Sequence, residues 1–507
     1  MKKFLALLLA SVMMLALLVG CGGGNDTPST NDTPSTTDTP STSDTPSTND
    51  TPAPSTDGDV PTITWYQVGG GMPSNIDSWT EKVNAYLDEK GIGAHLDMQI
   101  VSWSDWGNRR SMVVQTNEPY DIMFTDMGSY SSDVAMGAFA DLTDLIGEVP
   151  GITDLIPADY LKACEINGRL YGIPAYKDSS MTNFFVWTKE RIEAAYPDWA
   201  NIHTLDEATP ALVALKDMYS EPPVLFNQDG LSCVMGNRYD GMSVGLSGLG
   251  ISYFDGSNKV VPVLEQEDVI SQLRILHQWM NDGLINSDAA VLGEASGICG
   301  VSVAQGWPAA AKGWGEGRGA EVVVSQYGDT VLSNDTVQGS MACISASSSH
   351  KVEALKILEL VNTDSTMRDM LYYGEPGVNF EYVDEGGEQR VHKINTDWTM
   401  AGYTQGTTKT VTPEQGAVPF FEEVDAQNKN ATPSPALGFY FDAQAAGVAD
   451  KIAACQSIYE GYKSILLTGT ADPDVTVPEL MSAMRGAGFD DVLNAVQASF
   501  DEWRANQ

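Results

Sequence analysis

Basic residues are scarce in this 507-residue sequence. Lys and Arg number 28 against 68 Asp and Glu, which gives a formal net charge of −40. A field of this sign repels nucleic acid, anionic glycans and anionic lipid headgroups. The composition therefore argues against nucleic acid as a partner and favours a neutral or cationic ligand, unless a local basic pocket overrides the net charge.

Cysteine and histidine are also scarce. The sequence has six cysteines and five histidines, with no Cys-x-x-Cys and no His-x-x-x-His spacing. The common zinc sites need such spacings, so we expect no metal and no cofactor. Beyond Cys21 the cysteines are odd in number, so at least one is unpaired. They are Cys164, Cys233, Cys299, Cys343 and Cys455.

The apolar run at the N-terminus, from Phe4 to Val19, is shorter than a typical membrane-spanning helix. Two lysines precede it, as in an export signal. Leu18-Val19-Gly20-Cys21 resembles the lipobox of bacterial lipoproteins, in which the cysteine is acylated and becomes the new N-terminus. We therefore expect a lipoprotein signal peptide over residues 1–20 and a lipid anchor on Cys21. The alternative is an ordinary secretory signal.

A hexad repeat follows the signal. It reads Asn25-Asp26-Thr27-Pro28-Ser29-Thr30, and its copies continue to Thr56. The unit has no apolar face to stack, which excludes a repeat architecture. A proline and an aspartate in each copy favour an extended, disordered chain. We therefore expect residues 21–60 to form a tether that holds a folded domain at a membrane surface and lets it move above that surface.

The folded part begins with alternating strand and helix patterns. Thr62–Val68, Leu96–Val101 and Asp121–Asp126 favour strands, and the segments between them favour helices over Ile76–Glu89 and from about Asp105. This order predicts a parallel sheet with helices on both faces. Ligands bind at the carboxyl ends of the strands in such sheets. The predicted ligand-binding rim comprises Tyr66, Gln67, Trp103, Trp106 and Asp126.

Four segments resemble the extracellular solute-binding proteins of carbohydrate ABC importers. They are Pro119–Asp126 with Gly137–Ile146 after it, Gly168–Pro174, Trp279–Asp288 and Gly339–Asn362, and their order is more specific than any one of them. The resemblance implies an α/β, two-lobed, periplasmic-binding-protein-like fold of type II. Each lobe would have a central, mainly parallel sheet flanked by helices, with a hinge between the lobes.

The C-terminal quarter resembles that of larger lipoprotein members associated with complex-oligosaccharide uptake. Gly438–Asp442, Ala487–Phe489 and Asp501–Trp503 carry this likeness. Such members tend to read Tyr-Gly-x-Glu-Gly, whereas this chain reads Tyr373-Gly374-Glu375-Pro376-Gly377, with the acid one place early. Two residues of these segments, Glu375 and Tyr440, are candidate ligand contacts.

Sugar binding needs flat apolar faces against the C–H side of a pyranose ring and planar polar groups for its hydroxyls. Trp307 follows a predicted strand of the second lobe, and Trp314 lies in a glycine-rich segment that we expect to be a flexible loop. Tyr176 and Asp178 follow the first predicted crossing. These four residues are candidate contacts. Core packing is the alternative for each aromatic residue, and a turn or cap is the alternative for Asp126.

Enzymes form the main alternative class. Gly241-Met242-Ser243-Val244-Gly245 matches the G-x-S-x-G pattern of hydrolase nucleophiles, but the sequence before it is a poor strand and the sequence after it a poor helix. A surface-anchored glycan hydrolase needs only two well-placed carboxylates, and 68 acids leave that alternative open. A glycan-adhesion or sensor module without transport is a third alternative.

We expect a receptor rather than an enzyme. The resemblance implies that it captures a neutral oligosaccharide between two closing lobes and delivers it to the transmembrane subunits of an ABC permease. It would be a monomer at the cell membrane, anchored by lipid and facing the extracellular side. Lobe 1 would comprise residues 61–180 and 335–405, and lobe 2 would comprise 181–334 and 406–507, including the helical C-terminal module.

Overall fold

The computed structural model describes residues 60–295 and 297–507. The signal peptide, Cys21 and the tether lie outside these residues. Two separate hydrophobic cores are buried within the described part. The first is formed mainly by residues of 63–176 and 332–371, and the second mainly by residues of 185–327 and 436–500. Each core belongs to its own α/β lobe.

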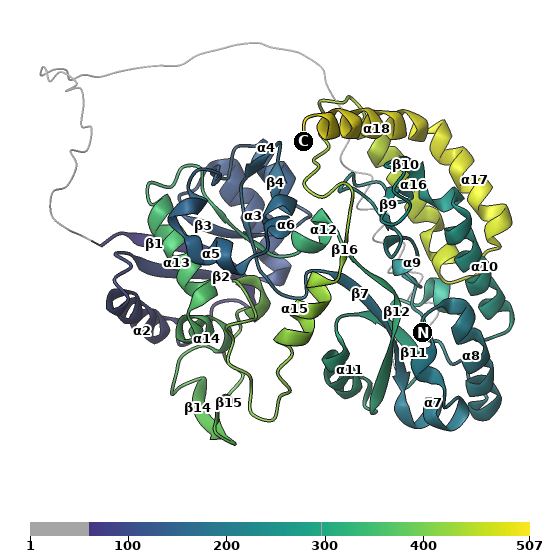
Figure 1. Ribbon diagram of the computed structural model, residues 1–507, viewed down its shortest axis with the longest axis horizontal. Helices are drawn as coiled ribbons and strands as arrows, with labels where there is room; N and C mark the ends of the chain where they lie inside the picture. The colour runs from purple at the N-terminus through teal and green to yellow at the C-terminus, as the bar shows by residue number, and fades with distance from the viewer. Residues whose placement is uncertain (1–59, 296) are drawn as a thin grey trace, which may run out of the picture. The chain divides into compact units, whose positions relative to one another are not determined.

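Lobe 1 is built on a five-stranded sheet with the order β2-β1-β3-β13-β6 (Figure 1). Its strands are β1 (Thr62–Gly69), β2 (His95–Ser102), β3 (Ile122–Thr125), β6 (Ile173–Pro174) and β13 (Met341–Ile344). β1 is parallel to β2 and β3, whereas β13 is antiparallel to β3 and β6. The three predicted strands are confirmed, and their carboxyl ends meet at one edge of the sheet.

The first two helices confirm the sequence pattern. α2 (Ile76–Glu89) buries Trp79, Val83 and Leu87 on one face, as residues four apart on a helix should be. α3 (Trp103–Thr116) begins slightly before the predicted start, because the Ser102 side chain accepts a hydrogen bond from the Asp105 backbone N–H (3.2 Å) and caps the helix.

The remaining elements of lobe 1 are short helices and hairpins. The helices are α4 (Tyr130–Ala135), α5 (Pro150–Leu155), α6 (Ala158–Ala163), α13 (Lys351–Thr363), α14 (Ser365–Tyr373), η1 (Ile146–Glu148) and η6 (Gly402–Thr404). The hairpins pair β4 (Glu165–Ile166) with β5 (Arg169–Leu170) and β14 (Phe380–Glu385) with β15 (Glu388–Lys393).

Lobe 2 contains a four-stranded sheet with the order β11-β7-β12-β16 and a three-stranded sheet with the order β10-β9-β8. The strands are β7 (Met181–Thr188), β11 (Val301–Gln305), β12 (Val322–Leu332), β16 (Thr432–Pro433), β8 (Tyr239–Asp240), β9 (Leu249–Ser252) and β10 (Val260–Pro262). β7 is antiparallel to both β11 and β12, and only β12 and β16 are parallel. This sheet therefore differs from the mainly parallel sheet that we expected in each lobe.

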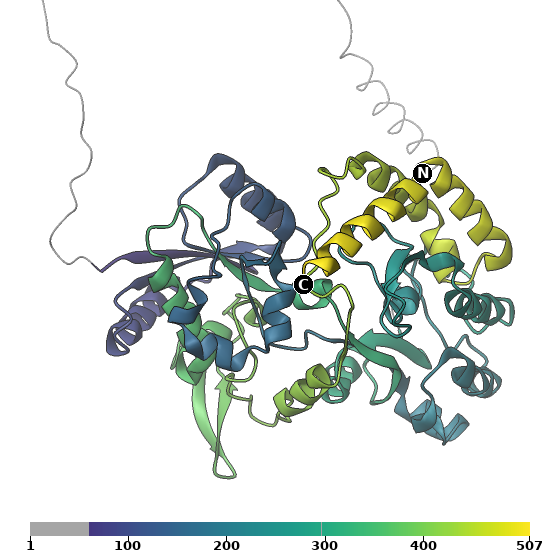
Figure 2. The ribbon, with the colours of Figure 1, turned by 45° about the horizontal axis from the view of Figure 1, so that its top comes forward.

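Helices cover the sheets of lobe 2. They are α7 (Lys189–Ala195), α8 (Leu205–Tyr219), α9 (Cys233–Gly236), α10 (Glu267–Asn281), α11 (Ala311–Arg318), α16 (Ala449–Leu467), α17 (Pro473–Gly486), α18 (Phe489–Ala505), η2 (Trp199–Asn201), η3 (Val263–Glu265), η4 (Ala289–Val291) and η5 (Pro308–Ala310). α16, α17 and α18 pack on one another, and α10 packs against α16 and α17 (Figure 2). The predicted helical C-terminal module is thus part of the second core.

The expectation of a flexible glycine-rich loop around Trp314 is wrong, because α11 carries this residue. Pro308 begins the turn that precedes the helix, where its missing N–H needs no partner. Gly319 ends the helix with φ of 71°, a conformation that favours glycine. Start and stop signals therefore outweigh the low helix propensity of the glycines between them.

Three stretches of chain cross between the lobes. Residues 175–180 join β6 to β7, the short helix α12 (Asn334–Val337) joins β12 to β13, and the segment after η6 leads to α15 (Phe421–Lys429) and β16. No helix among the described residues has the length and apolar character needed to span a membrane.

Candidate functional site

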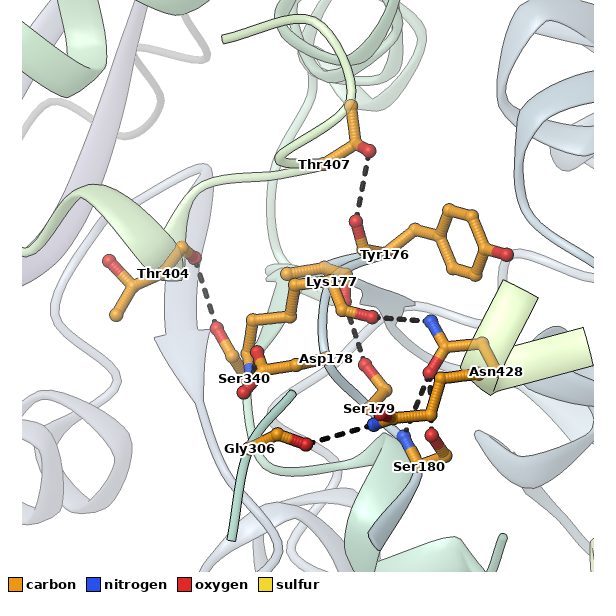
Figure 3. A network of polar contacts seen from close by, with 12 residues as sticks. Tyr176, Lys177, Asp178, Ser179, Ser180, Gly306, Ser340, Thr404, Thr407 and Asn428 are labelled. Carbon is orange, nitrogen blue, oxygen red and sulfur yellow. Dashed lines mark hydrogen bonds and ion pairs between the residues drawn. The ribbon is translucent and has the colours of Figure 1, made fainter. Parts of the chain in front are cut away.

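The first and third crossings are tied together by buried hydrogen bonds (Figure 3). The Asn428 side-chain oxygen on α15 accepts from the backbone N–H (3.1 Å) and the hydroxyl (2.8 Å) of Ser180, and its amide nitrogen donates to the Lys177 carbonyl (2.6 Å). The Thr407 hydroxyl donates to the Tyr176 carbonyl (2.9 Å). The crossings are therefore fixed beside each other at the junction of the lobes.

Two aromatic side chains lie exposed at the carboxyl edge of the lobe 1 sheet. The rings of Trp103 and Tyr403 stack with 6.4 Å between centroids and 13° between planes, and the residues are 46% and 48% exposed. Trp103 begins α3 directly after β2, whereas Tyr403 comes from η6. Asp126 directly follows β3 at the same edge and accepts a hydrogen bond from the Gly128 N–H (3.0 Å). This edge thus offers a flat apolar surface with a carboxylate nearby.

Other residues predicted for this rim are buried beneath it. Tyr66 and Trp106 are each 6% exposed, and Gln67 is fully buried. The Tyr66 hydroxyl donates to Glu118 (3.0 Å), and burial together with this carboxylate raises the pKa of Tyr66. Gln67 accepts from the Thr404 hydroxyl (2.8 Å). The side chains of these three residues are therefore buried within lobe 1 and do not form part of the exposed rim.

Tyr176 and Asp178 lie on the first crossing itself, whereas the sequence placed them just beyond it. Tyr176 is 2% exposed, and its hydroxyl donates to Asp425 on α15 (2.6 Å). Burial and this carboxylate raise the pKa of Tyr176. The Asp178 side chain is partly exposed and pairs with Lys177 (3.2 Å). The Tyr176 hydroxyl is thus already bonded to α15, whereas the Asp178 carboxylate is accessible.

Trp307 lies where lobe 2 meets the third crossing. Its ring stacks on Phe420 with 4.9 Å between centroids and 24° between planes. Close by, the Ala309 N–H donates to Glu423 on α15 (2.9 Å). The end of β11 therefore presents an aromatic pair formed by lobe 2 and the third crossing.

Trp314 packs behind this strand end. Its ring centroid lies 6.2 Å from that of Phe184, and a Cβ atom added at Gly306 would lie 2.7 Å from its Cζ2 atom. The absence of a side chain at Gly306 lets the indole approach the backbone there. Trp314 thus supports the backbone beside Trp307.

Glu375 and Tyr440 belong to neither aromatic pair. Glu375 is 3% exposed and accepts from Lys82 (2.8 Å) and Ser78 (2.6 Å) on α2. Burial alone would raise the pKa of Glu375, but these donors hold it below its usual value. Tyr440 is half-buried on the segment after β16 and packs against the lobe 1 core. Its position joins the C-terminal part of the chain to lobe 1.

Sequence reasoning missed Tyr403, Phe420 and Arg368. The first two lie on irregular segments without periodicity, and only contacts distant in the sequence reveal them. Arg368 on α14 is fully buried, and it donates to the carbonyls of Thr407 (2.7 Å) and Gly402 (2.6 Å). Burial lowers the pKa of Arg368 to about 10. This guanidinium holds the segment that presents Tyr403, and a lone arginine in an amphipathic helix gives no signal of that role.

The surroundings of Ser243 do not form a nucleophile elbow. The two-residue strand β8 precedes the segment and β9 follows it, so no helix starts at the serine. The Ser243 hydroxyl donates to Asp335 (2.6 Å), and among the described residues no histidine forms a hydrogen bond with it. The motif therefore lacks the helix that follows a hydrolase nucleophile, as the sequence around it predicted.

Comparison with known proteins finds substrate- and solute-binding proteins of transporters. A carbohydrate ABC transporter substrate-binding protein of Streptococcus pneumoniae serotype 4 is 28% identical in a 481-residue alignment that covers 89% of this chain and 92% of that protein. The crystal structure of the N-glycan transport solute-binding protein NgtS from S. pneumoniae is 26% identical and superposes with a TM-score of 0.78, covering 88% of this chain and 99% of that one.

Complexes of NgtS with Man1GlcNAc and Man5GlcNAc superpose with TM-scores of 0.67 and 0.65. A solute-binding protein from Bifidobacterium longum infantis that binds human milk oligosaccharides, at 15% identity and a TM-score of 0.60 over 88% of this chain and 99% of that one, shares the fold. Residues 435–505 match a family model described as a domain of unknown function, DUF3502.

The fold and the junction between the lobes define a two-lobed solute-binding protein of type II, which confirms the predicted fold class. With the relatives above, the chain is similar to solute-binding proteins of carbohydrate ABC transporters. Those relatives are binding proteins of transporters rather than enzymes.

Proposed function

We propose that this protein captures an oligosaccharide between its lobes and delivers it to the membrane subunits of an ABC importer. The observation that carries the proposal is the pair of aromatic surfaces, Trp103 with Tyr403 in lobe 1 and Trp307 with Phe420 at the crossing. Flat aromatic faces of this kind bind the apolar side of pyranose rings. The net charge of −40 supports a neutral rather than an acidic glycan.

Closure of the lobes supplies the signal for transport. A ligand that contacts both lobes favours the closed arrangement only by the difference in its binding free energy between the two arrangements. The network of Asn428 and Thr407 keeps the crossings together while the lobes move. The lower TM-scores against the glycan complexes than against the structure with no named glycan support such a change of arrangement.

The predicted site residues divide into two groups in this proposal. Trp103, Asp126, Asp178 and Trp307 contact the glycan, together with the added Tyr403 and Phe420. The other predicted residues support that surface, because their side chains are buried or half-buried against protein. These supporting residues are Tyr66, Gln67, Trp106, Tyr176, Trp314, Glu375 and Tyr440.

The proposed lobes keep the boundaries expected from the sequence. Lobe 1 comprises residues 61–180 and 335–405, and lobe 2 comprises 181–334 and 406–507. The two buried cores support this division, although Leu332 and Leu437 pack in the first core. We also propose that the protein is a monomer.

We propose lipid anchoring through Cys21 at the outer face of the cell membrane, with the repeat segment as a tether. The lipobox-like sequence supports this proposal. In the producing bacterium, Cys21→Ser should move the full chain from the membrane fraction to the medium. Retention of that variant in the membrane fraction would reject anchoring through Cys21.

Thermal unfolding of the fragment from Val60 onward tests the binding proposal. Man1GlcNAc, Man5GlcNAc and an acidic oligosaccharide serve as probes, and chromatography checks that they remain intact. A ligand at one hundred times its dissociation constant should stabilise the fold by about 2.7 kcal/mol. Stabilisation by an intact neutral glycan supports the proposal, whereas stabilisation only by other solutes such as peptides would reject the carbohydrate assignment.

A further inference from the structure

Trp307 lies between two residues that affect its backbone in opposite ways. Gly306 follows the end of β11, and Pro308 begins η5. A proline restricts the residue before it to extended conformations, and Trp307 is extended, with φ of −140° and ψ of 163°. A glycine allows many conformations. The direction of the Trp307 indole therefore depends on what fixes Gly306 and the start of η5.

The Gly306 backbone is bonded to two different elements. Its N–H donates to the Thr182 carbonyl of β7 (3.1 Å), and its carbonyl accepts from the Gln427 side-chain nitrogen of α15 (3.0 Å). β7 is part of the four-stranded sheet of lobe 2, whereas α15 belongs to the third crossing. The glycine is thus fixed between that sheet and the crossing helix.

Glu423 on α15 fixes the chain on the other side of Trp307. Pro308 has no N–H, so Ala309 carries the first N–H of η5, and that group donates to the Glu423 carboxylate (2.9 Å). An indole has no acceptor for such a bond, and the Trp307 side chain does not cap the turn. The acceptor therefore comes from another element, and its charge makes the bond stronger than one between neutral groups.

Glu423 and Gln427 lie four residues apart on α15, so they share one face of the helix. The same helix also holds the first crossing, because Asp425 accepts from the Tyr176 hydroxyl (2.6 Å). One short helix is thus bonded both to the first crossing and to the segment that carries Trp307.

We propose that Glu423 and Gln427 are positioning residues, which hold the Trp307 indole where a pyranose ring stacks on it. The inference rests on the proposed oligosaccharide binding and adds two residues that act on the glycan only through Trp307. A stacking face that is already in place loses less conformational entropy on binding than a mobile one. Because α15 also holds the first crossing, the position of this face is tied to the junction at which the lobes close.

Alanine substitutions at two neighbouring glutamates test the role of Glu423. Glu423→Ala removes the acceptor of the Ala309 N–H, whereas Glu422 beside it is exposed and serves as the control. We measure the affinity for Man5GlcNAc by calorimetry and check the fold by thermal unfolding. Glu423→Ala should weaken binding about fivefold, and Glu422→Ala should leave it unchanged. Equal affinities of the two variants would overturn the role of Glu423.

The Trp307→Ala background separates positioning from a general effect on the structure. Trp307→Ala alone should weaken binding of Man5GlcNAc at least about fivefold, because it removes the stacking face. A residue that acts only through the indole has nothing left to position, so adding Glu423→Ala should then change the affinity by less than about twofold. The same fivefold loss in both backgrounds would assign Glu423 a structural role and overturn the proposal.

Conservative substitutions give an independent measurement. Glutamine keeps an acceptor for the Ala309 N–H without the charge, so Glu423→Gln should bind within about twofold of the wild-type protein. An affinity as low as that of Glu423→Ala would show that the bond itself is not what matters. Gln427→Met cannot donate to the Gly306 carbonyl and should weaken binding, whereas the same change at the exposed Gln444 should not. Equal affinities of these two methionine variants would remove Gln427 from the role.

The outcomes also distinguish this inference from the proposed function. If the wild-type protein binds neither Man1GlcNAc nor Man5GlcNAc, both fail. If it binds and Trp307→Ala binds equally well, only the positioning inference fails.

Discussion

Trp103 and Tyr403 lie with nearly parallel rings at the edge of lobe 1, although one follows β2 and the other belongs to η6, much later in the chain. Neither ring is needed to fill the core, since about half of each residue is exposed. An exposed aromatic pair at the carboxyl edge of a sheet is where a ligand is expected in this class of fold.

Replacement of Trp103 should therefore affect binding and leave folding intact. Trp103→Ala removes a stacking face worth about 1–2 kcal/mol, which corresponds to roughly a 5- to 30-fold loss of affinity for Man5GlcNAc. Met112 on the same helix is 48% exposed, and Met112→Ala is the control. Calorimetry measures the affinity and thermal unfolding checks the fold. Equal affinity of both variants would remove Trp103 from the site.

Asn428 should be important for stability. Asn428→Ala leaves the N–H and hydroxyl of Ser180 and the Lys177 carbonyl without their partner. Unpaired buried groups cost about 1–3 kcal/mol, so the free energy of unfolding in urea should fall by that amount. Asn430→Ala on an exposed position should change it by less than about 0.5 kcal/mol. A similarly small change for Asn428→Ala would contradict the role of this network.

Arg368 should not tolerate replacement by lysine. Its fork reaches the carbonyls of Gly402 and Thr407 and the Gln405 side chain (3.0 Å) together. An ammonium cannot reproduce this geometry, so Arg368→Lys should lower the free energy of unfolding by about 2–4 kcal/mol. Arg274→Lys in an exposed ion pair is the control, with an expected change below about 1 kcal/mol. A chemical denaturation series compares them, and equal stability would show that the fork is dispensable.

Asp240 should make stability depend on pH. Burial, with a smaller contribution from the nearby Asp335, raises the pKa of Asp240 to about 6, although a hydrogen bond from Ser434 opposes the rise. A carboxyl with a raised pKa binds a proton in the folded state before it does so unfolded. Stability due to this group is therefore full below about pH 4 and falls as the pH rises to about 6.

Asp240→Asn should abolish that fall. Relative to the wild-type protein, the variant should gain about 2–3 kcal/mol between pH 4 and pH 7. Urea unfolding at several pH values measures the difference, and Asp217→Asn on an exposed position serves as the control. A wild-type curve parallel to that of Asp240→Asn across this range would show that Asp240 does not titrate there.

Local patterns predicted the framework of lobe 1 well. α2 has a strong apolar face and β1, β2 and β3 are separated by clear helices, so short-range information was sufficient. The rule that ligands bind at the carboxyl ends of strands placed Trp103 and Asp126 at the edge. It could not distinguish them from the buried Tyr66, because the register of a strand decides the direction in which each side chain points.

Other features depend on contacts between distant segments. Tyr403 and Phe420 lie on irregular chain whose path is set by Arg368 and by α15, and their positions cannot be read from nearby residues. The helix around Trp314 escaped prediction because glycines lower propensity, while the packing of its ring against Gly306 favours it. The antiparallel sheet of lobe 2 likewise follows from pairings that no local pattern encodes.

The position of Phe420 has a thermodynamic consequence. The Phe420 ring stacks on Trp307, and the next residue, Phe421, packs against Tyr176 of the first crossing, so a glycan that shifts one contact alters the other. The binding free energies lost on replacing Trp307 and Tyr176 should therefore not add, and a double-mutant cycle should give an interaction energy above about 0.5 kcal/mol. The contacts of the glycan would then be coupled to one another. The binding free energy of a fragment would be less favourable than the sum expected from its separate contacts.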